Sequence, residues 1–71
     1  MDFELRYRAM EARDDRYAGD FFAAVTSTGI YCRPGCPARM PKRENVRFYL
    51  TTAAARNDGF RACLRCHPDE V

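Results

Sequence analysis

The four cysteines of this 71-residue chain form two close pairs, and this arrangement constrains the fold more than any other feature. Three residues separate Cys32 from Cys36, two separate Cys63 from Cys66, and 26 residues lie between the pairs. Each pair can occupy two corners of a tetrahedron if the intervening segment folds back, which is the geometry of structural zinc sites. The spacing therefore predicts one Zn²⁺ ion held by all four cysteines.

A chain of this length needs such a staple, because small domains bury a low fraction of their surface. The hydrophobic content of 46% argues against disorder. Disulfides are the alternative staple, but the acidic N-terminus has no apolar stretch of the kind found in secretory signals. No apolar run reaches the roughly 18 residues that cross a membrane. We therefore expect a cytoplasmic zinc-binding domain that spans residues 1–71 and has no membrane partner.

Two other metal chemistries fit part of the cysteine pattern. Residues 63–67 match the C-x-x-C-H signature of haem attachment. Haem attachment would leave Cys32 and Cys36 without a role and has no export signal to support it, so we expect His67 to lie outside the ligand set. An all-sulfur site also accepts iron, which the sequence alone does not separate from zinc.

Basic residues concentrate in the half of the chain that carries the cysteines. Residues 1–31 have a net charge of −2, whereas residues 32–66 have a net charge of +6. Seven of the eight cations in the second segment are arginines, which are suited to bidentate contacts with phosphate. This distribution is typical of a solvated basic face or of a nucleic-acid-binding surface, and charge alone leaves both open.

Periodicity and turn residues predict two helices and two strands. The expected elements are an N-terminal helix capped by Asp2 with Phe3, Tyr7 and Met10 on its inner face, a turn at 14–20, a strand at 21–28, a loop at 32–37, a strand at 45–51, a short helix through 53–55 that Gly59 ends, and a turn at 63–66. In the second strand Val46, Phe48 and Leu50 should face the core. Thr51 or Thr52 is the expected N-cap of the second helix.

The prolines near the cysteines bear on which thiolate is reactive. A zinc-bound thiolate is ionised and can attack carbon, but backbone N–H groups that point at the sulfur reduce its nucleophilicity. In tight metal-binding turns the N–H two residues after a cysteine commonly points at its sulfur. Pro34 removes this donor after Cys32, and Pro68 removes it after Cys66. These two remain as candidates for a reactive thiolate, beside the more common case of four inert ligands.

Three blocks of the sequence resemble the N-terminal domain of the Ada family. They are residues 28–36, 42–49 and 59–66, and the likeness runs from about residue 14 to residue 68 with the cysteine spacing intact. Members of this family are bacterial methylphosphotriester-DNA methyltransferases of the response to alkylation damage. The resemblance implies an α+β domain, in which a short β-sheet is flanked by helices and one zinc ion is bound by four cysteines.

The resemblance also implies a reaction and a partner. Cys32, the first cysteine of the motif, is expected to accept a methyl group from a methylphosphotriester in double-stranded DNA, irreversibly and once per molecule. The loss of negative charge should then raise DNA affinity and act as a transcription switch. The DNA contacts carried over from the family are Thr28, Arg39 and Arg61, with Arg33 and Arg65 as neighbours. Some relatives carry a basic DNA-contacting residue where this chain has Pro37, so one phosphate contact is expected to be missing.

A second class of function remains open at this point, namely a structural zinc module that binds nucleic acid with four inert thiolates. The two classes differ in whether Cys32 accepts a methyl group. The resemblance further implies a monomer that is a fragment of a longer bacterial chain. Relatives continue into a helix-turn-helix regulator, a base-methyl transferase or a DNA glycosylase.

Overall fold

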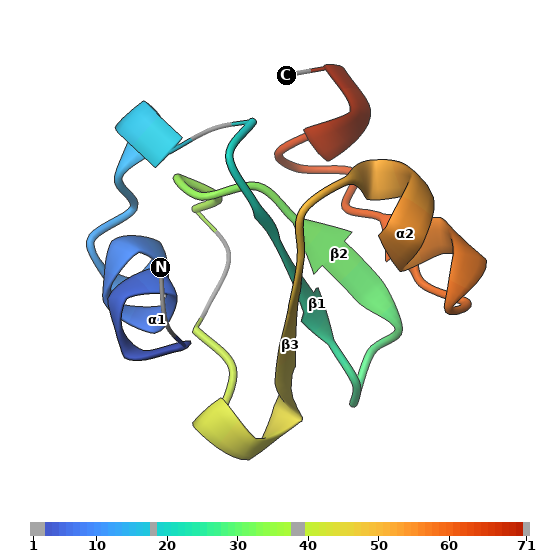
Figure 1. The fold of residues 1–71 in the computed structure, drawn as a ribbon, viewed down its shortest axis with the longest axis horizontal. Helices are drawn as coiled ribbons and strands as arrows, with labels where there is room; N and C mark the ends of the chain where they lie inside the picture. Colours follow the sequence, from blue (N-terminus) through green and yellow to red (C-terminus); the bar gives the residue numbers. More distant parts are fainter. Residues whose placement is uncertain (1–2, 18, 38–39, 71) are drawn as a thin grey trace.

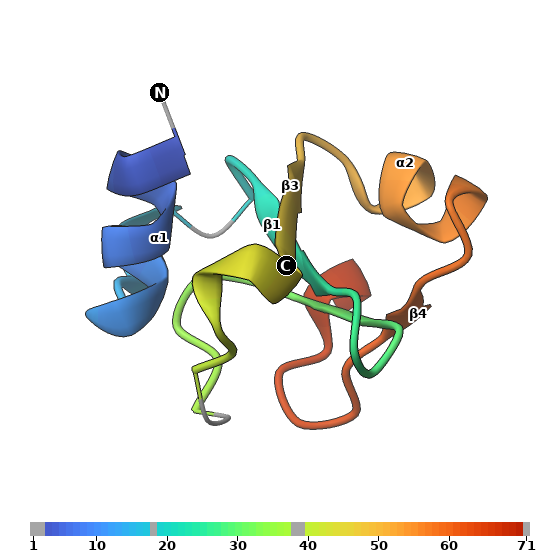
Figure 2. The same cartoon turned by 90° about the horizontal axis from the view of Figure 1, so that it is seen from below.

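The structure, a computed structural model, describes residues 3–17, 19–37 and 40–70. Its regular elements are α1 (Phe3–Glu11), β1 (Phe22–Val25), β2 (Ile30–Cys32), β3 (Val46–Tyr49), α2 (Thr52–Asn57) and β4 (Arg61–Ala62), with short 3₁₀ turns at Asp15–Tyr17, Arg43–Asn45 and Pro68–Glu70. The four strands form one sheet in the order β3-β1-β2-β4; Figure 1 labels the first three strands and Figure 2 labels β4. β1 pairs antiparallel with β2 and β3, whereas β4 pairs parallel with β2. The expected α+β fold with a small sheet between helices is confirmed.

The sheet separates two small cores, and the helices lie on opposite sides of it (Figure 2). On one face Ala23 of β1 and its partner Cys32 of β2 pack with the buried side of α1. On the other face Ala24 and its partner Tyr31 pack against α2. This division follows from the two-residue period of a strand, which sends neighbouring side chains to opposite faces. The cysteines therefore belong to the core on the α1 side.

The helices form largely as their sequences predict. Tyr7 and Met10 on the inner face of α1 are buried, and Phe3, although 38% exposed, stacks on Tyr7 and meets the edge of Phe48. The expected cap Asp2 lies outside the described residues. The hydroxyl oxygen of Thr51 accepts a hydrogen bond from the N–H of Ala54 at 3.1 Å, which confirms it as the N-cap of α2.

The first predicted strand was too long, and a second strand beside it was missed. β1 ends at Val25 because its carbonyl accepts the N–H groups of Thr28 and Gly29, which closes a turn. Gly29 has a φ of +74°, which glycine adopts without steric cost. The chain then returns as β2, so Cys32 ends a strand instead of starting a loop. Three residues next to Pro34 and Gly35 are too few to show strand alternation.

The predicted inner face of the 45–51 strand was also wrong in part. Val46 is buried and Phe48 packs against the core, but Leu50 is 65% exposed. β3 ends at Tyr49 because Thr51 turns the chain into α2, so the alternation of the strand no longer applies at Leu50. In the described part of the chain, neither helix has the length and apolar character needed to cross a membrane.

Candidate metal centre

The four cysteines come together at the ends of two paired strands. Cys32 is the last residue of β2 and Cys63 directly follows β4, and the parallel pairing of Tyr31 with Ala62 places these two cysteines side by side. The N–H of Cys63 donates to the carbonyl of Tyr31 at 3.0 Å. Sequence patterns did not predict β4, because two residues are too few to show the alternation of a strand. This missed strand is what brings the second cysteine pair to the first.

Each pair is completed by a turn. The N–H of Cys36 donates to the carbonyl of Arg33 at 3.2 Å, across Pro34 and Gly35. Gly35 has a φ of +92°, and Pro-Gly at the two central positions is typical of a type II turn. In the second pair the N–H of His67 donates to the carbonyl of Cys63 at 3.1 Å. These turns place two sulfurs from each pair in the same small volume.

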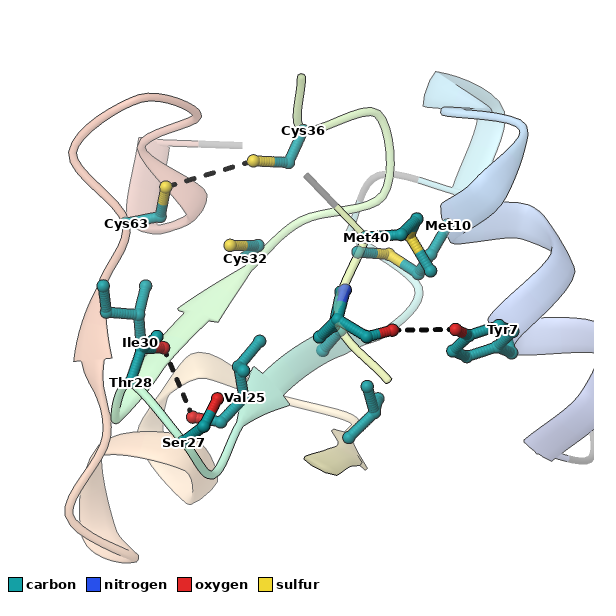
Figure 3. A pocket seen from close by; sticks show the side chains of 13 residues that line it. Tyr7, Met10, Val25, Ser27, Thr28, Ile30, Cys32, Cys36, Met40 and Cys63 are labelled. Carbon is teal, nitrogen blue, oxygen red and sulfur yellow. Dashed lines mark hydrogen bonds between the residues drawn. The ribbon is translucent and has the colours of Figure 1, made fainter. Parts of the chain in front are cut away.

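The sulfur positions fit one tetrahedral metal ion. All four cysteines are buried, and their Sγ atoms lie within 4.8 Å of one another. The Sγ atoms of Cys36 and Cys63 are 4.0 Å apart (Figure 3). Zn–S bonds of about 2.3 Å place tetrahedral sulfurs about 3.8 Å apart. A disulfide has an S–S distance of about 2.05 Å, so this pair is suited to metal binding and not to a disulfide.

The pKa shifts of the clustered thiols are consistent with a site for a cation. A hydrogen bond to Cys66, burial and the charges of the other cysteines together raise the pKa of the Cys32 thiol. The same hydrogen bond lowers the pKa of Cys66 to about 5. The sulfurs therefore share protons when they have only one another as partners. A divalent cation that ligates them displaces these protons, and four thiolates favour zinc over harder cations.

Both neighbours of Cys32 tie it to the segment that carries Cys66. The Arg33 guanidinium donates from Nε to the carbonyl oxygen of Cys66 at 2.9 Å. The Tyr31 hydroxyl donates to Oδ1 of Asp69 at 2.6 Å, and Arg56 of α2 forms an ion pair with the same carboxylate at 2.9 Å. Sequence reasoning missed Tyr31, Arg56 and Asp69, because nothing in their spacing relates the three positions.

Cys32 and Cys66 differ in what shifts their pKa values. A hydrogen bond to Cys32 and the backbone of Arg33 lower the pKa of Cys66, whereas its thiol neighbours and burial raise the pKa of Cys32. Cys32 also lines an apolar pocket beside the cluster, whereas Cys66 lies outside that pocket. The two candidates that the sequence left equal are thus in different surroundings.

The residues predicted to contact DNA differ in exposure and in their partners. Thr28 and Arg61 are exposed and close together, since the N–H of Arg61 donates to the carbonyl of Gly29 at 2.8 Å. Arg65 is exposed in the turn between Cys63 and Cys66. Arg33 is only half exposed, and its guanidinium is engaged with the cysteine loops. Arg39 lies outside the described residues.

Comparison with known proteins places the chain in a family. Residues 5–69 match the model of the metal-binding domain of Ada. The chain is 57% identical over 68 residues to a probable bifunctional transcriptional activator/DNA repair enzyme AlkA of Mycobacterium tuberculosis, covering 96% of this chain and 14% of that protein. It spans between 14% and 30% of the length of the curated relatives that it matches.

Two solved structures share the fold over the whole chain. The crystal structure of the methylated N-Ada/DNA complex superposes on this chain with a TM-score of 0.97 at 46% identity. The match covers all of this chain and 54% of the chain in that complex. The refined structure of the DNA methyl phosphotriester repair domain of Escherichia coli Ada superposes on this chain with a TM-score of 0.86 at 45% identity. This match covers all of this chain and 77% of the Ada domain. The chain, with its four clustered cysteines, belongs to the family of the metal-binding domain of Ada.

Proposed function

We propose that this protein repairs DNA by accepting a methyl group from a backbone methylphosphotriester onto Cys32, irreversibly and once per molecule. Membership of the Ada family supports this proposal, as does the similarity to a DNA methyl phosphotriester repair domain and to a methylated, DNA-bound N-Ada. The observation that carries the choice of residue is that Cys32 lines the pocket beside the cluster, whereas Cys66 lies outside that pocket.

The reaction is an in-line displacement at the methyl carbon. The Sγ–C bond forms as the C–O bond breaks, and the bonding electron pair leaves with the phosphate oxygen. The products are S-methylcysteine and an ordinary phosphodiester anion, so no proton has to be moved. Bound zinc supplies the positive charge that keeps the thiolates ionised at neutral pH. The chain contributes the position of Cys32 at the end of β2 and the turns that hold its neighbours.

Charge gives a reason why the damaged link is selected. Four thiolates around one Zn²⁺ carry a formal charge of −2, which repels ordinary phosphodiesters. A methylphosphotriester is neutral and is not repelled. We assign Thr28, Arg61 and Arg65 to the flanking phosphates, because all three are exposed near the two cysteine pairs. Arg33 we assign to the cysteine loops, given its hydrogen bonds there.

Methyl transfer also changes the affinity for DNA. When one thiolate becomes a neutral thioether, the formal charge of the cluster falls from −2 to −1. Repulsion of unmodified phosphates decreases, so the methylated protein should bind undamaged duplex more tightly. Relatives are named as transcriptional activators as well as repair enzymes, which supports a damage-response switch that works through a further DNA-binding region of a longer chain. We propose that the protein acts as a monomer on duplex DNA.

Mass spectrometry tests this proposal directly. The zinc-loaded protein is incubated with duplex DNA that carries methylphosphotriesters, and its intact mass is measured under denaturing and native conditions. We expect a gain of one methyl group, mapped by digestion to Cys32, with zinc retained. Cys32→Ser should lose the transfer, whereas Cys66→Ser, which also replaces one ligand, should still be methylated at Cys32 provided that its measured metal content is preserved.

The competing function gives a different result in the same experiment. If protein that holds zinc and binds the damaged DNA gains no mass, its thiolates are inert and it is a structural zinc module. If the methyl group is found on Cys66 or Cys36, the reaction stands but the assignment of the nucleophile is wrong.

A further inference from the structure

The pocket beside the cluster is larger than methyl transfer requires. It has a volume of about 290 Å³, which includes the space next to the metal ligands Cys32, Cys36 and Cys63, and it is bounded by α1, by one face of the sheet and by Met40 and Pro41. Figure 3 shows the cysteines toward one end of this pocket and Met10 and Tyr7 toward the other. A water molecule takes about 30 Å³ of liquid, and a methyl group is of similar size. The pocket therefore has room for several carbon atoms next to Cys32.

The chemistry of the walls is suited to hydrocarbon. Met10, Val25, Ile30, Met40 and Val46 supply apolar side chains, and among the described residues the only charged groups that line the pocket are the metal-binding thiolates at its one end. Ser27 and Thr28, both exposed, lie in the turn at its edge, and the Thr28 hydroxyl donates to the carbonyl of Val25 at 3.4 Å. Enclosed apolar cavities bind small hydrocarbon groups, and the apolar side chains here offer an alkyl group the same kind of contact. Methionine side chains can adjust to fit a guest of varying shape.

We propose that this pocket receives the alkyl chain of phosphotriesters larger than methyl, so that ethyl and n-propyl phosphotriesters in DNA are also substrates. This inference rests on the proposed function, since it uses the same nucleophile. The balance of the step is unchanged: Sγ of Cys32 bonds to the carbon attached to oxygen, the C–O bond breaks, and the electron pair leaves with the phosphate oxygen. The remaining carbons of the alkyl group lie against Val25 and Met40, which line the pocket.

The test compares alkyl groups within each protein variant. Zinc-loaded protein is mixed with duplexes that carry a single methyl, ethyl or n-propyl phosphotriester, and the rate of mass gain is measured for each. In-line displacement is intrinsically slower at ethyl than at methyl, so the informative quantity is the ethyl-to-methyl rate ratio of a variant relative to the wild type. We expect stoichiometric S-ethyl and S-propyl products on wild-type Cys32.

Val25→Phe fills the pocket and should lower the ethyl-to-methyl ratio at least tenfold. Leu50→Phe adds a phenyl ring at an exposed position outside the pocket and should leave the ratio unchanged. Val25→Ile adds only one methyl group and keeps the β-branched shape that suits a strand. Val25→Ile replaces Val25→Phe in the test if Val25→Phe fails to hold zinc. It should reduce the rate of n-propyl transfer more than the rate of ethyl transfer.

The outcomes separate the two proposals. If the methyl group is transferred but ethyl and n-propyl groups are not, the pocket inference is wrong and the proposed function stands. If no alkyl group is transferred, the proposed function itself fails. If the ethyl-to-methyl rate ratio is the same in wild type, Val25→Phe and Val25→Ile, the alkyl group of the substrate lies elsewhere, and the assignment of this pocket is wrong.

Discussion

The side chain of Arg33 donates from Nε to the backbone carbonyl oxygen of Cys66 at 2.9 Å, although 33 positions separate the two residues in the sequence. The backbone of the same arginine is also among the causes that lower the pKa of Cys66, after the hydrogen bond to Cys32. The Arg33 side chain thus holds the carbonyl of the fourth cysteine from the position directly after Cys32. Arg33 therefore acts as a positioning residue between the two cysteine loops.

Replacing Arg33 with lysine should weaken metal retention while keeping the charge. Lysine presents its charge at one flexible end and does not reproduce the Nε geometry. Loss of a hydrogen bond from a charged donor costs about 1.5 kcal/mol, which corresponds to about tenfold in the rate of zinc release to a chelator. Arg65→Lys, on the exposed turn, is the matched control and should release zinc at the wild-type rate. Equal rates of zinc release from wild type, Arg33→Lys and Arg65→Lys would contradict the positioning role of Arg33.

Tyr31→Phe should show how much the hydrogen bond between Tyr31 and Asp69 contributes to the free energy of unfolding. The Tyr31 side chain is 0% exposed, and its hydroxyl bonds to Asp69 at 2.6 Å. Removing it takes one hydrogen bond from the Asp69 carboxylate, which keeps its ion pair with Arg56, and should lower the free energy of unfolding by about 1 kcal/mol. Tyr49→Phe removes a hydroxyl with the same 2.6 Å distance to Asp58, but at the surface, and should cost less than about 0.5 kcal/mol.

Urea unfolding of the zinc-bound variants, at one fixed excess of zinc, measures both changes. A loss for Tyr49→Phe as large as that for Tyr31→Phe would mean that burial does not decide the contribution of these hydroxyls.

The contrast between local and long-range features explains what the sequence could predict. The Thr51 cap, the inner face of α1 and the four-cysteine set depend on residues close in sequence or on ligand chemistry, and all were predicted. β4 was not, because its two residues are strand only through pairing with β2. The hydrogen bond from the Arg33 side chain to the Cys66 carbonyl was missed for the same reason, since the two residues lie 33 positions apart in the sequence.

Stability above neutral pH should also depend on Tyr31. Burial, followed by the hydrogen bond to Asp69, raises the pKa of Tyr31. A group whose pKa is higher in the folded than in the unfolded state contributes stability that is complete below its unfolded pKa of about 10 and is lost as pH rises toward its folded value. The free energy of unfolding of the wild type should therefore fall more steeply above pH 10 than that of Tyr31→Phe. Parallel pH profiles from urea titrations would contradict this.

Arg61 and Arg65 should each contribute about one phosphate contact. For duplex DNA the logarithm of the binding constant falls with the logarithm of salt concentration by about 0.9 per phosphate contact. Arg61→Ala and Arg65→Ala should each make the slope less steep by about 0.9. Arg8→Ala removes an exposed arginine on α1 that pairs with Glu4 at 3.7 Å, and should leave the slope unchanged. Fluorescence anisotropy at several salt concentrations measures all four proteins, and a smaller slope for Arg8→Ala would move the DNA surface toward α1.

Pro37→Arg should add the phosphate contact that this chain is expected to lack. Pro37 is exposed directly after Cys36, so a guanidinium at this position can reach a phosphate beside the cluster without displacing core residues. We expect the salt slope to steepen by about 0.9 and the affinity for duplex DNA to rise at low salt. Pro37→Ala is the control, because it changes the backbone in the same way but adds no charge. If the arginine and alanine variants bind DNA with the same slope and the same zinc content, position 37 faces away from the DNA, and the interface lies on the side of Thr28 and Arg61.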